Sequence, residues 1–107
     1  MSMKTIIAIS LLLCGSAQAH EALPSKMQPT GWQYGWECCS FNDCRQVSTG
    51  DVSQTPAGYL IKQTGEIIPY LDSRIKRSKD EFYHQCTVAG DPQALHSICL
   101  YAPDQGF

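Results

Sequence analysis

Three of the chain's six cysteines fall in one short run, Trp36-Glu37-Cys38-Cys39-Ser40-Phe41-Asn42-Asp43-Cys44. Two more, Cys86 and Cys99, lie far downstream. Any bond between them and the run would tie the end of the chain back to its first half. This spacing is typical of a small exported domain that relies on disulfides because its core is modest.

Residues 1–19 have the pattern of a cleaved secretory signal peptide. Lys4 gives a positive start, residues 6–13 form a short apolar run, and Ala17-Gln18-Ala19 places small residues at the cleavage positions. The sixth cysteine, Cys14, leaves with this segment, and lipidation at Cys14 is the weaker alternative. The expected location of the mature protein is therefore the periplasm or the extracellular medium.

The predicted mature chain, residues 20–107, has the length of one domain. Without Lys4 it carries 7 basic and 10 acidic side chains, a net charge of −3, which argues against nucleic-acid binding. No later apolar run approaches the roughly 20 residues needed to cross a bilayer, so we expect no stable membrane insertion.

Short runs rich in β-formers, separated by turn residues, predict a mostly β fold with a single small antiparallel sheet. Thr64-Gly65 between two such runs predicts a hairpin. The expected strands are Gln46–Ser48, Tyr59–Gln63, Glu66–Tyr70, Phe82–Cys86 and His96–Ala102.

Two further runs have a structural and a functional interpretation. Trp32, Tyr34 and Trp36 alternate at period two, which predicts a strand whose rings cover the core; the alternative is an aromatic platform for a sugar or peptide. The basic residues between Arg74 and Lys79 indicate a solvated loop or one helical turn; the alternative is a site for an anion or an acidic partner.

Five cysteines remain after processing, so at most two intramolecular disulfides form and one cysteine is left over. A bond between adjacent Cys38 and Cys39 would be strained. We favour pairing one of these two with Cys86 or Cys99, with a second bond at Cys44. The alternative is two local bonds, Cys44 with Cys38 or Cys39 and Cys86 with Cys99. In extended backbone the side chains of Cys38 and Cys39 would point to opposite faces, one inward and one outward.

A metal site is an alternative role for the leftover cysteine. His84 and Cys86 are two residues apart, which places an imidazole and a thiol on one face of a strand. Cleavage after Ala19 would make His20 the N-terminal residue, whose amine and imidazole suit Cu(II), whereas a free thiol favours Cu(I). The candidate ligands for copper or zinc are therefore His20, His84 and Cys86, although no Cys-x₂-Cys repeat typical of zinc sites is present.

The chain lacks the common catalytic motifs: no G-x-S-x-G, H-E-x-x-H, P-loop or G-x-G-x-x-G pattern occurs. We therefore expect a non-enzymatic binding or accessory protein without a cofactor. Its partner would be an unidentified envelope protein or ligand, and the chain itself a monomer or weak dimer. The alternative function is a periplasmic protein that binds copper or zinc.

Several motifs, quoted at the end of this paragraph, together resemble a group of small, uncharacterised, exported cysteine-rich proteins of Gram-negative, chiefly alphaproteobacterial, bacteria. The resemblance covers most of the predicted mature chain. It implies a periplasmic or secreted domain, carries over no catalytic residue, and fits either disulfides or a metal site at the shared histidines and cysteines. The motifs are Trp36-Glu37-Cys38-Cys39, Asp43-Cys44, Gly58-Tyr59, Thr64-Gly65-Glu66-Ile67-Ile68-Pro69-Tyr70, Phe82-Tyr83-His84-Gln85-Cys86 and Ile98-Cys99-Leu100-Tyr101-Ala102-Pro103.

Overall fold

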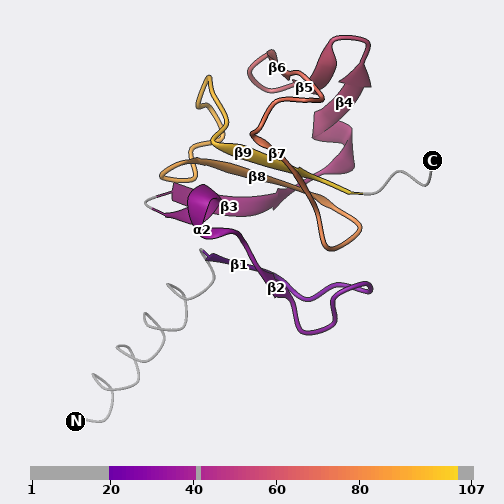
Figure 1. Cartoon of the computed structure of the whole chain (residues 1–107), viewed down its shortest axis with the longest axis vertical. Coiled ribbons are helices and arrows are strands. Elements are labelled where there is room, and N and C mark those ends of the chain that lie inside the picture. Colours follow the sequence, from indigo (N-terminus) through magenta and orange to yellow (C-terminus); the bar gives the residue numbers. More distant parts are fainter. Residues whose placement is uncertain (1–19, 41, 104–107) are drawn as a thin grey trace, which may run out of the picture.

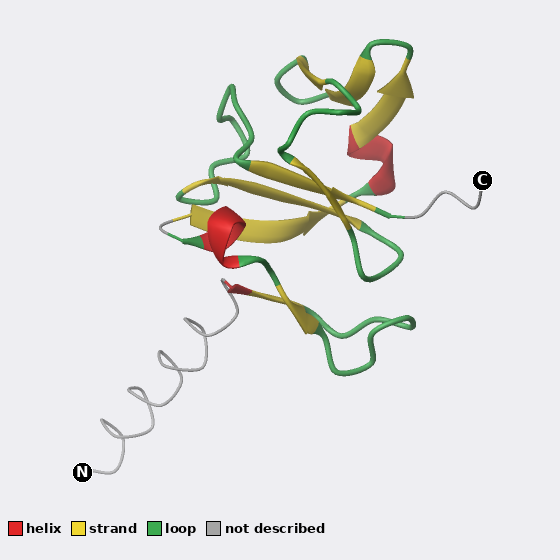
Figure 2. Ribbon diagram, in the orientation of Figure 1, coloured by secondary structure: helices red, strands yellow, loops and turns green. Residues whose placement is uncertain are grey.

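Strands dominate the computed structural model of this protein, which describes residues 20–40 and 42–103 (Figure 1; Figure 2). The mostly β class is confirmed, and the strands divide among three sheets of two, four and three strands. Within the described residues, no helix is long and apolar enough to cross a membrane. The predicted signal peptide, residues 1–19, lies outside the described residues.

The central sheet has the strand order β3-β8-β9-β7. Its pairs are antiparallel, except that β7 runs parallel to β9. Figure 1 shows this sheet between an N-terminal arm, residues 21–39, and the three-stranded sheet of residues 52–68. The strands are β3 Asn42–Val47, β7 Ile75–Arg77, β8 Tyr83–Val88 and β9 Cys99–Ala102.

Strand β7 lies inside the run for which we expected a loop or one helical turn, so that expectation is wrong. Two backbone bonds fix the strand beside β9: Leu100 N–H donates to the Arg74 carbonyl and Ser78 N–H donates to the Ala102 carbonyl, both at 2.9 Å. Ile75 packs against one hydrophobic cluster of the core. Because Ile75 is a single apolar residue among charged neighbours, this segment has no alternation of apolar and polar residues that would predict a strand.

The second sheet is formed by consecutive hairpins of β4 Val52–Thr55, β5 Gly58–Ile61 and β6 Glu66–Ile68, preceded by a 3₁₀ turn, η2 Thr49–Asp51. The predicted hairpin around Thr64-Gly65 is confirmed, and β6 ends before Pro69, which cannot donate to a ladder.

Strands β8 and β9 are buried on both faces and separate two hydrophobic clusters. Along each of these two strands, successive side chains point alternately to one cluster and to the other. On one face lie the β4–β6 sheet's apolar residues with Tyr83, Leu100 and Ala102. On the other lie Cys86, Cys99, Tyr101 and the aromatic residues of the N-terminal arm. The sheet therefore positions side chains for two different environments.

The arm contains β1 Glu21–Ala22 paired with β2 Trp32–Gln33, followed by the one-turn helix α2 Trp36–Cys39. Trp32 and Tyr34 are buried as expected, but Trp36 is 75% exposed. The expected alternating strand ends because the amides of Cys38 and Cys39 both donate to the Gly35 carbonyl, which winds the chain into α2. Trp36 is thereby directed away from the other two rings.

The disulfides are Cys38–Cys99 and Cys44–Cys86, which agrees with the favoured pairing scheme. Cys44 and Cys86 are direct partners across β3 and β8, and Cys86 is in turn opposite Cys99 across β8 and β9. Cys39 is the free cysteine. The expectation that one of the adjacent pair faces outward is wrong, because α2 packs into the core and leaves Cys38 and Cys39 only 0% and 4% exposed.

Removing one disulfide should lower the free energy of unfolding by about 2–5 kcal/mol, because the unfolded chain then regains conformational freedom. The test is urea denaturation of the Cys44→Ala/Cys86→Ala double variant, followed by circular dichroism. Cys39→Ala is the matched control, since it removes a buried sulfur and leaves both bonds intact. Equal stability of wild type in oxidising and reducing buffer would contradict the prediction.

Candidate functional site

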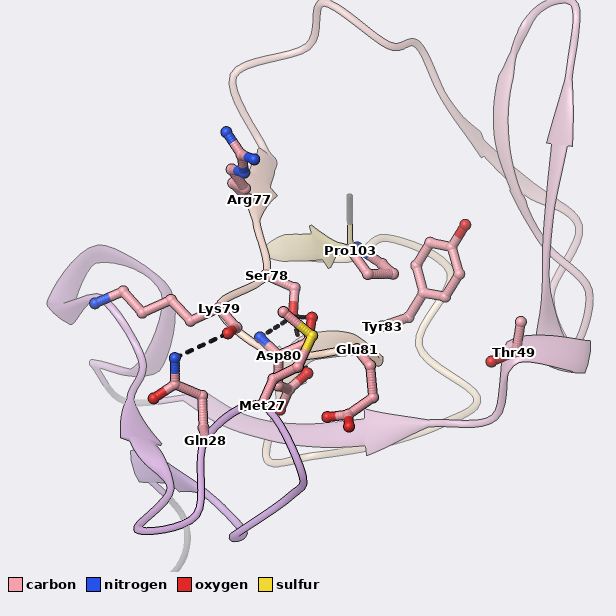
Figure 3. A pocket seen from close by; sticks show the side chains of 10 residues that line it. All are labelled: Met27, Gln28, Thr49, Arg77, Ser78, Lys79, Asp80, Glu81, Tyr83 and Pro103. Carbon is pink, nitrogen blue, oxygen red and sulfur yellow. Dashed lines mark hydrogen bonds between the residues drawn. The ribbon is translucent and has the colours of Figure 1, made fainter. Parts of the chain in front are cut away.

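A cavity of about 580 Å³ opens where three parts of the chain meet. The first is the loop between β1 and β2, and the second is the segment from β7 into β8. The third is formed by Thr49 of η2 and by Pro103, which follows β9. Gln28 Nε2 donates to the Lys79 carbonyl at 3.0 Å, which holds the first two parts together (Figure 3). We call this cavity the cleft; its lining residues are Met27, Gln28, Thr49, Arg77, Ser78, Lys79, Asp80, Glu81, Tyr83 and Pro103.

The wall of the cleft combines both signs of charge with apolar surface. Lys79 and Glu81 flank the buried Asp80 in sequence, and Met27 is 60% exposed at the edge. A hydrogen bond from the Ser25 hydroxyl lowers the pKa of Glu81, so this carboxylate is ionised at neutral pH. A ligand with a cation, an anion and an apolar group would therefore find a counterpart for each.

The floor of the cleft is the carboxylate of Asp80, which is only 2% exposed. Four donors from three parts of the chain surround it: Trp32 Nε1 at 2.9 Å, the Ser78 hydroxyl at 3.0 Å, Phe82 N–H at 2.8 Å and His84 Nε2 at 2.8 Å. Burial alone would raise the pKa of Asp80, but the bonds from Trp32, His84 and Phe82 outweigh it and hold that pKa below its ordinary value. The floor is thus a fixed, ionised acceptor.

His84 continues this network toward the arm. An ionised carboxylate only accepts, so Nε2 of His84 carries the proton and donates to Asp80. The other nitrogen, Nδ1, lies 2.8 Å from the Tyr34 hydroxyl, which donates to it when the imidazole is neutral. Burial, together with the negative charge of Asp80, raises the pKa of Tyr34, so the phenol stays protonated. Asp80, His84 and Tyr34 therefore form one buried chain of hydrogen bonds.

Ser78 and Asp80 line the cleft and His84 lies buried behind Asp80, but the connections among these three side chains differ from those of a hydrolase triad. In a triad the histidine contacts the serine and the aspartate orients the histidine. Here the Ser78 hydroxyl donates to Asp80, and His84 uses both ring nitrogens on Asp80 and Tyr34. The imidazole is therefore not the partner of Ser78, whose hydroxyl bonds to a carboxylate that three other donors also hold.

The three predicted metal ligands do not come together. Cys86 is bonded to Cys44, so its sulfur is not a thiolate donor, and both nitrogens of His84 are engaged in the buried network. His84 and Cys86 are two residues apart in β8 and therefore share a strand face, but His20 lies at a different cavity. In residues 20–40 and 42–103, no three His, Cys, Asp or Glu side chains form a group that could hold a metal ion.

A second cavity, of about 380 Å³, contains His20 and the free cysteine, Cys39. Its other lining residues are Glu21, Gln33, Tyr34 and Trp36. The sequence indicated His20 as a candidate ligand and one leftover cysteine, but not that His20 and Cys39 line the same cavity. The role of Asp80 was not predicted, although the sequence held two signals of it. One is its i,i+4 spacing to His84, and the other is the need of a buried Trp N–H for a hydrogen-bond acceptor.

No family model, no curated protein and no solved structure matches this chain. The resemblance to exported cysteine-rich proteins stays a prediction. What the protein does is therefore inferred from its own contacts.

Asp80→Asn should lower the free energy of unfolding by roughly 1–3 kcal/mol, because the amide nitrogen cannot accept and buried donors that now bond to the carboxylate are left unpaired. The pKa of Asp80 is depressed in the folded state, so its stabilisation is present above the unfolded value of about 3.9 and is lost as pH falls through the folded value. Stability measured by urea denaturation should consequently fall more steeply below pH 4 in wild type than in Asp80→Asn.

Glu37→Gln is the control for this experiment. Glu37 has a 63% exposed side chain and one long contact, 3.8 Å, with Lys76. Its loss should change stability by less than about 1 kcal/mol. Equal effects of the two substitutions would show that the Asp80 network does not hold the cleft.

Proposed function

We propose that this protein is a non-enzymatic binding protein of the periplasm or extracellular medium, and that its cleft receives an extended peptide segment of an envelope protein. The observation that carries the proposal is the cleft itself: opposite charges and apolar groups stand on its wall above a floor of fully engaged polar groups. A peptide segment supplies the complementary chemistry, since side chains of both charges and apolar side chains occur along one backbone.

The fixed floor supports binding rather than catalysis. Asp80 accepts four hydrogen bonds and the donors come from β2, β8 and the segment between β7 and β8. A site held in one geometry loses little conformational entropy when a ligand enters. The same engagement keeps the His84 imidazole away from Ser78, so these side chains do not form a triad, which supports a non-enzymatic role.

The two disulfides support the proposed location. Such bonds form and persist in oxidising compartments, and they are rare in the reducing cytosol. The alternative metal-binding function loses its predicted ligand set, since Cys86 is oxidised and His84 is enclosed. A monomer or weak dimer remains the expected state.

The test starts with a random peptide library displayed on phage and selected on immobilised oxidised protein. A selected peptide, synthesised and titrated into ¹⁵N-labelled protein, should shift amide resonances around residues 77–83 and Met27. Lys79→Glu and Glu81→Lys should each weaken binding about tenfold or more, because a like charge then faces the ligand.

Lys62→Glu is the matched control. Lys62 is an exposed lysine in the turn between β5 and β6 and does not line the cleft. The same charge reversal there should leave the affinity within about twofold, because Lys62 is solvent-exposed and outside the cleft lining, where water and salt weaken its effect on a bound peptide. Shifts confined to other surfaces, or equal effects of Lys62→Glu and Lys79→Glu, would refute the cleft as the binding site.

A further inference from the structure

The second cavity brings together Cys39 and His20, neither of which lines the cleft. Cys39 is the free thiol, because Cys38, Cys44, Cys86 and Cys99 are all oxidised. It is 4% exposed and lines the same cavity as the exposed imidazole of His20. A soft sulfur donor therefore stands at the base of a hollow that has a nitrogen donor at its wall.

The backbone of Tyr34 holds both residues in place. Its N–H donates to the His20 carbonyl at 3.2 Å, and its carbonyl accepts a hydrogen bond from the Cys39 thiol, whose sulfur is 4.0 Å away. Tyr34 is itself fixed, since its hydroxyl bonds to His84 inside the core. His20 and Cys39 are thus bonded to the amide and to the carbonyl of one buried residue, and His20 is exposed.

We propose that Cys39 and His20 bind a single Cu(I) ion in this cavity. Thiolate and imidazole are the protein ligands that suit Cu(I), and this ion accepts coordination by as few as two donors. Zn²⁺ in structural sites takes four ligands, and no group of three His, Cys, Asp or Glu side chains exists in the described residues. The site is therefore suited to the ion that needs the fewest ligands.

The binding reaction replaces the proton of the Cys39 thiol. The S–H bond breaks, the sulfur forms a bond to Cu(I), and the proton leaves to solvent, with no change of oxidation state at either atom. Affinity should therefore fall with decreasing pH, as protons compete for both sulfur and imidazole. Cleavage after Ala19 would add the α-amine of His20 as a third donor on the same residue.

The test is an anaerobic titration of oxidised, signal-processed protein with Cu(I) held by bathocuproine disulfonate, without thiol reductants. Wild type should withdraw one equivalent of copper from the chelator and gain a near-ultraviolet sulfur-to-copper absorption. Cys39→Ser should lose both signals. His20→Ala should weaken Cu(I) binding by roughly tenfold to hundredfold or more. Loss of a group that only supports a metal ligand already has an effect of this size.

His96→Ala is the matched control, because His96 is an exposed histidine that does not line the cavity, and its affinity should equal that of wild type. Alkylation offers a measurement that needs no variant. Because Cys39 is the free thiol and lines the cavity, Cu(I) bound to its sulfur should slow its reaction with iodoacetamide in wild type. Failure of wild type to compete with the chelator, an unchanged affinity in His20→Ala, or no protection of Cys39 would overturn the proposal.

Discussion

One buried negative charge organises this molecule. The carboxylate of Asp80 accepts hydrogen bonds from Trp32, Ser78, Phe82 and His84, and thereby joins the arm, the segment after β7 and the strand β8. The cleft takes its floor from this group, and Tyr34 takes its position from His84 one step farther along. Both cavities thus depend on the same ionised side chain, one directly and the other through the imidazole and the phenol.

Much of the fold followed from two patterns in the sequence. The cysteine spacing predicted long-range disulfides between Trp36–Cys44 and the C-terminal strands, and alternating β-formers predicted the hairpin β5–β6. Strand β7 and helix α2 could not be read in this way. Both are very short. The strand forms because it pairs with β9, which is distant in sequence, and the helix forms because two amides donate to the carbonyl of Gly35.

The candidate sites were predictable in their parts but not in their connections. His20, His84 and Cys86 all carry metal-binding atoms, yet composition cannot show that strand register places Cys86 opposite Cys44. Likewise the odd number of cysteines indicated a free thiol without identifying Cys39. Which sulfur is left over depends on the turn of α2, which directs Cys38 toward Cys99 and leaves Cys39 beside the Tyr34 backbone.

The two disulfides are nested, since Cys44–Cys86 lies inside the loop that Cys38–Cys99 closes. The whole β4–β5–β6 sheet and the exposed Leu71 after it fall within both loops. A protease that cuts the chain there would produce two fragments still joined by two covalent bonds. The cleft, the Asp80 network and the Cys39 cavity all draw on residues outside the β4–β6 sheet, so such a nicked protein would keep its sites connected.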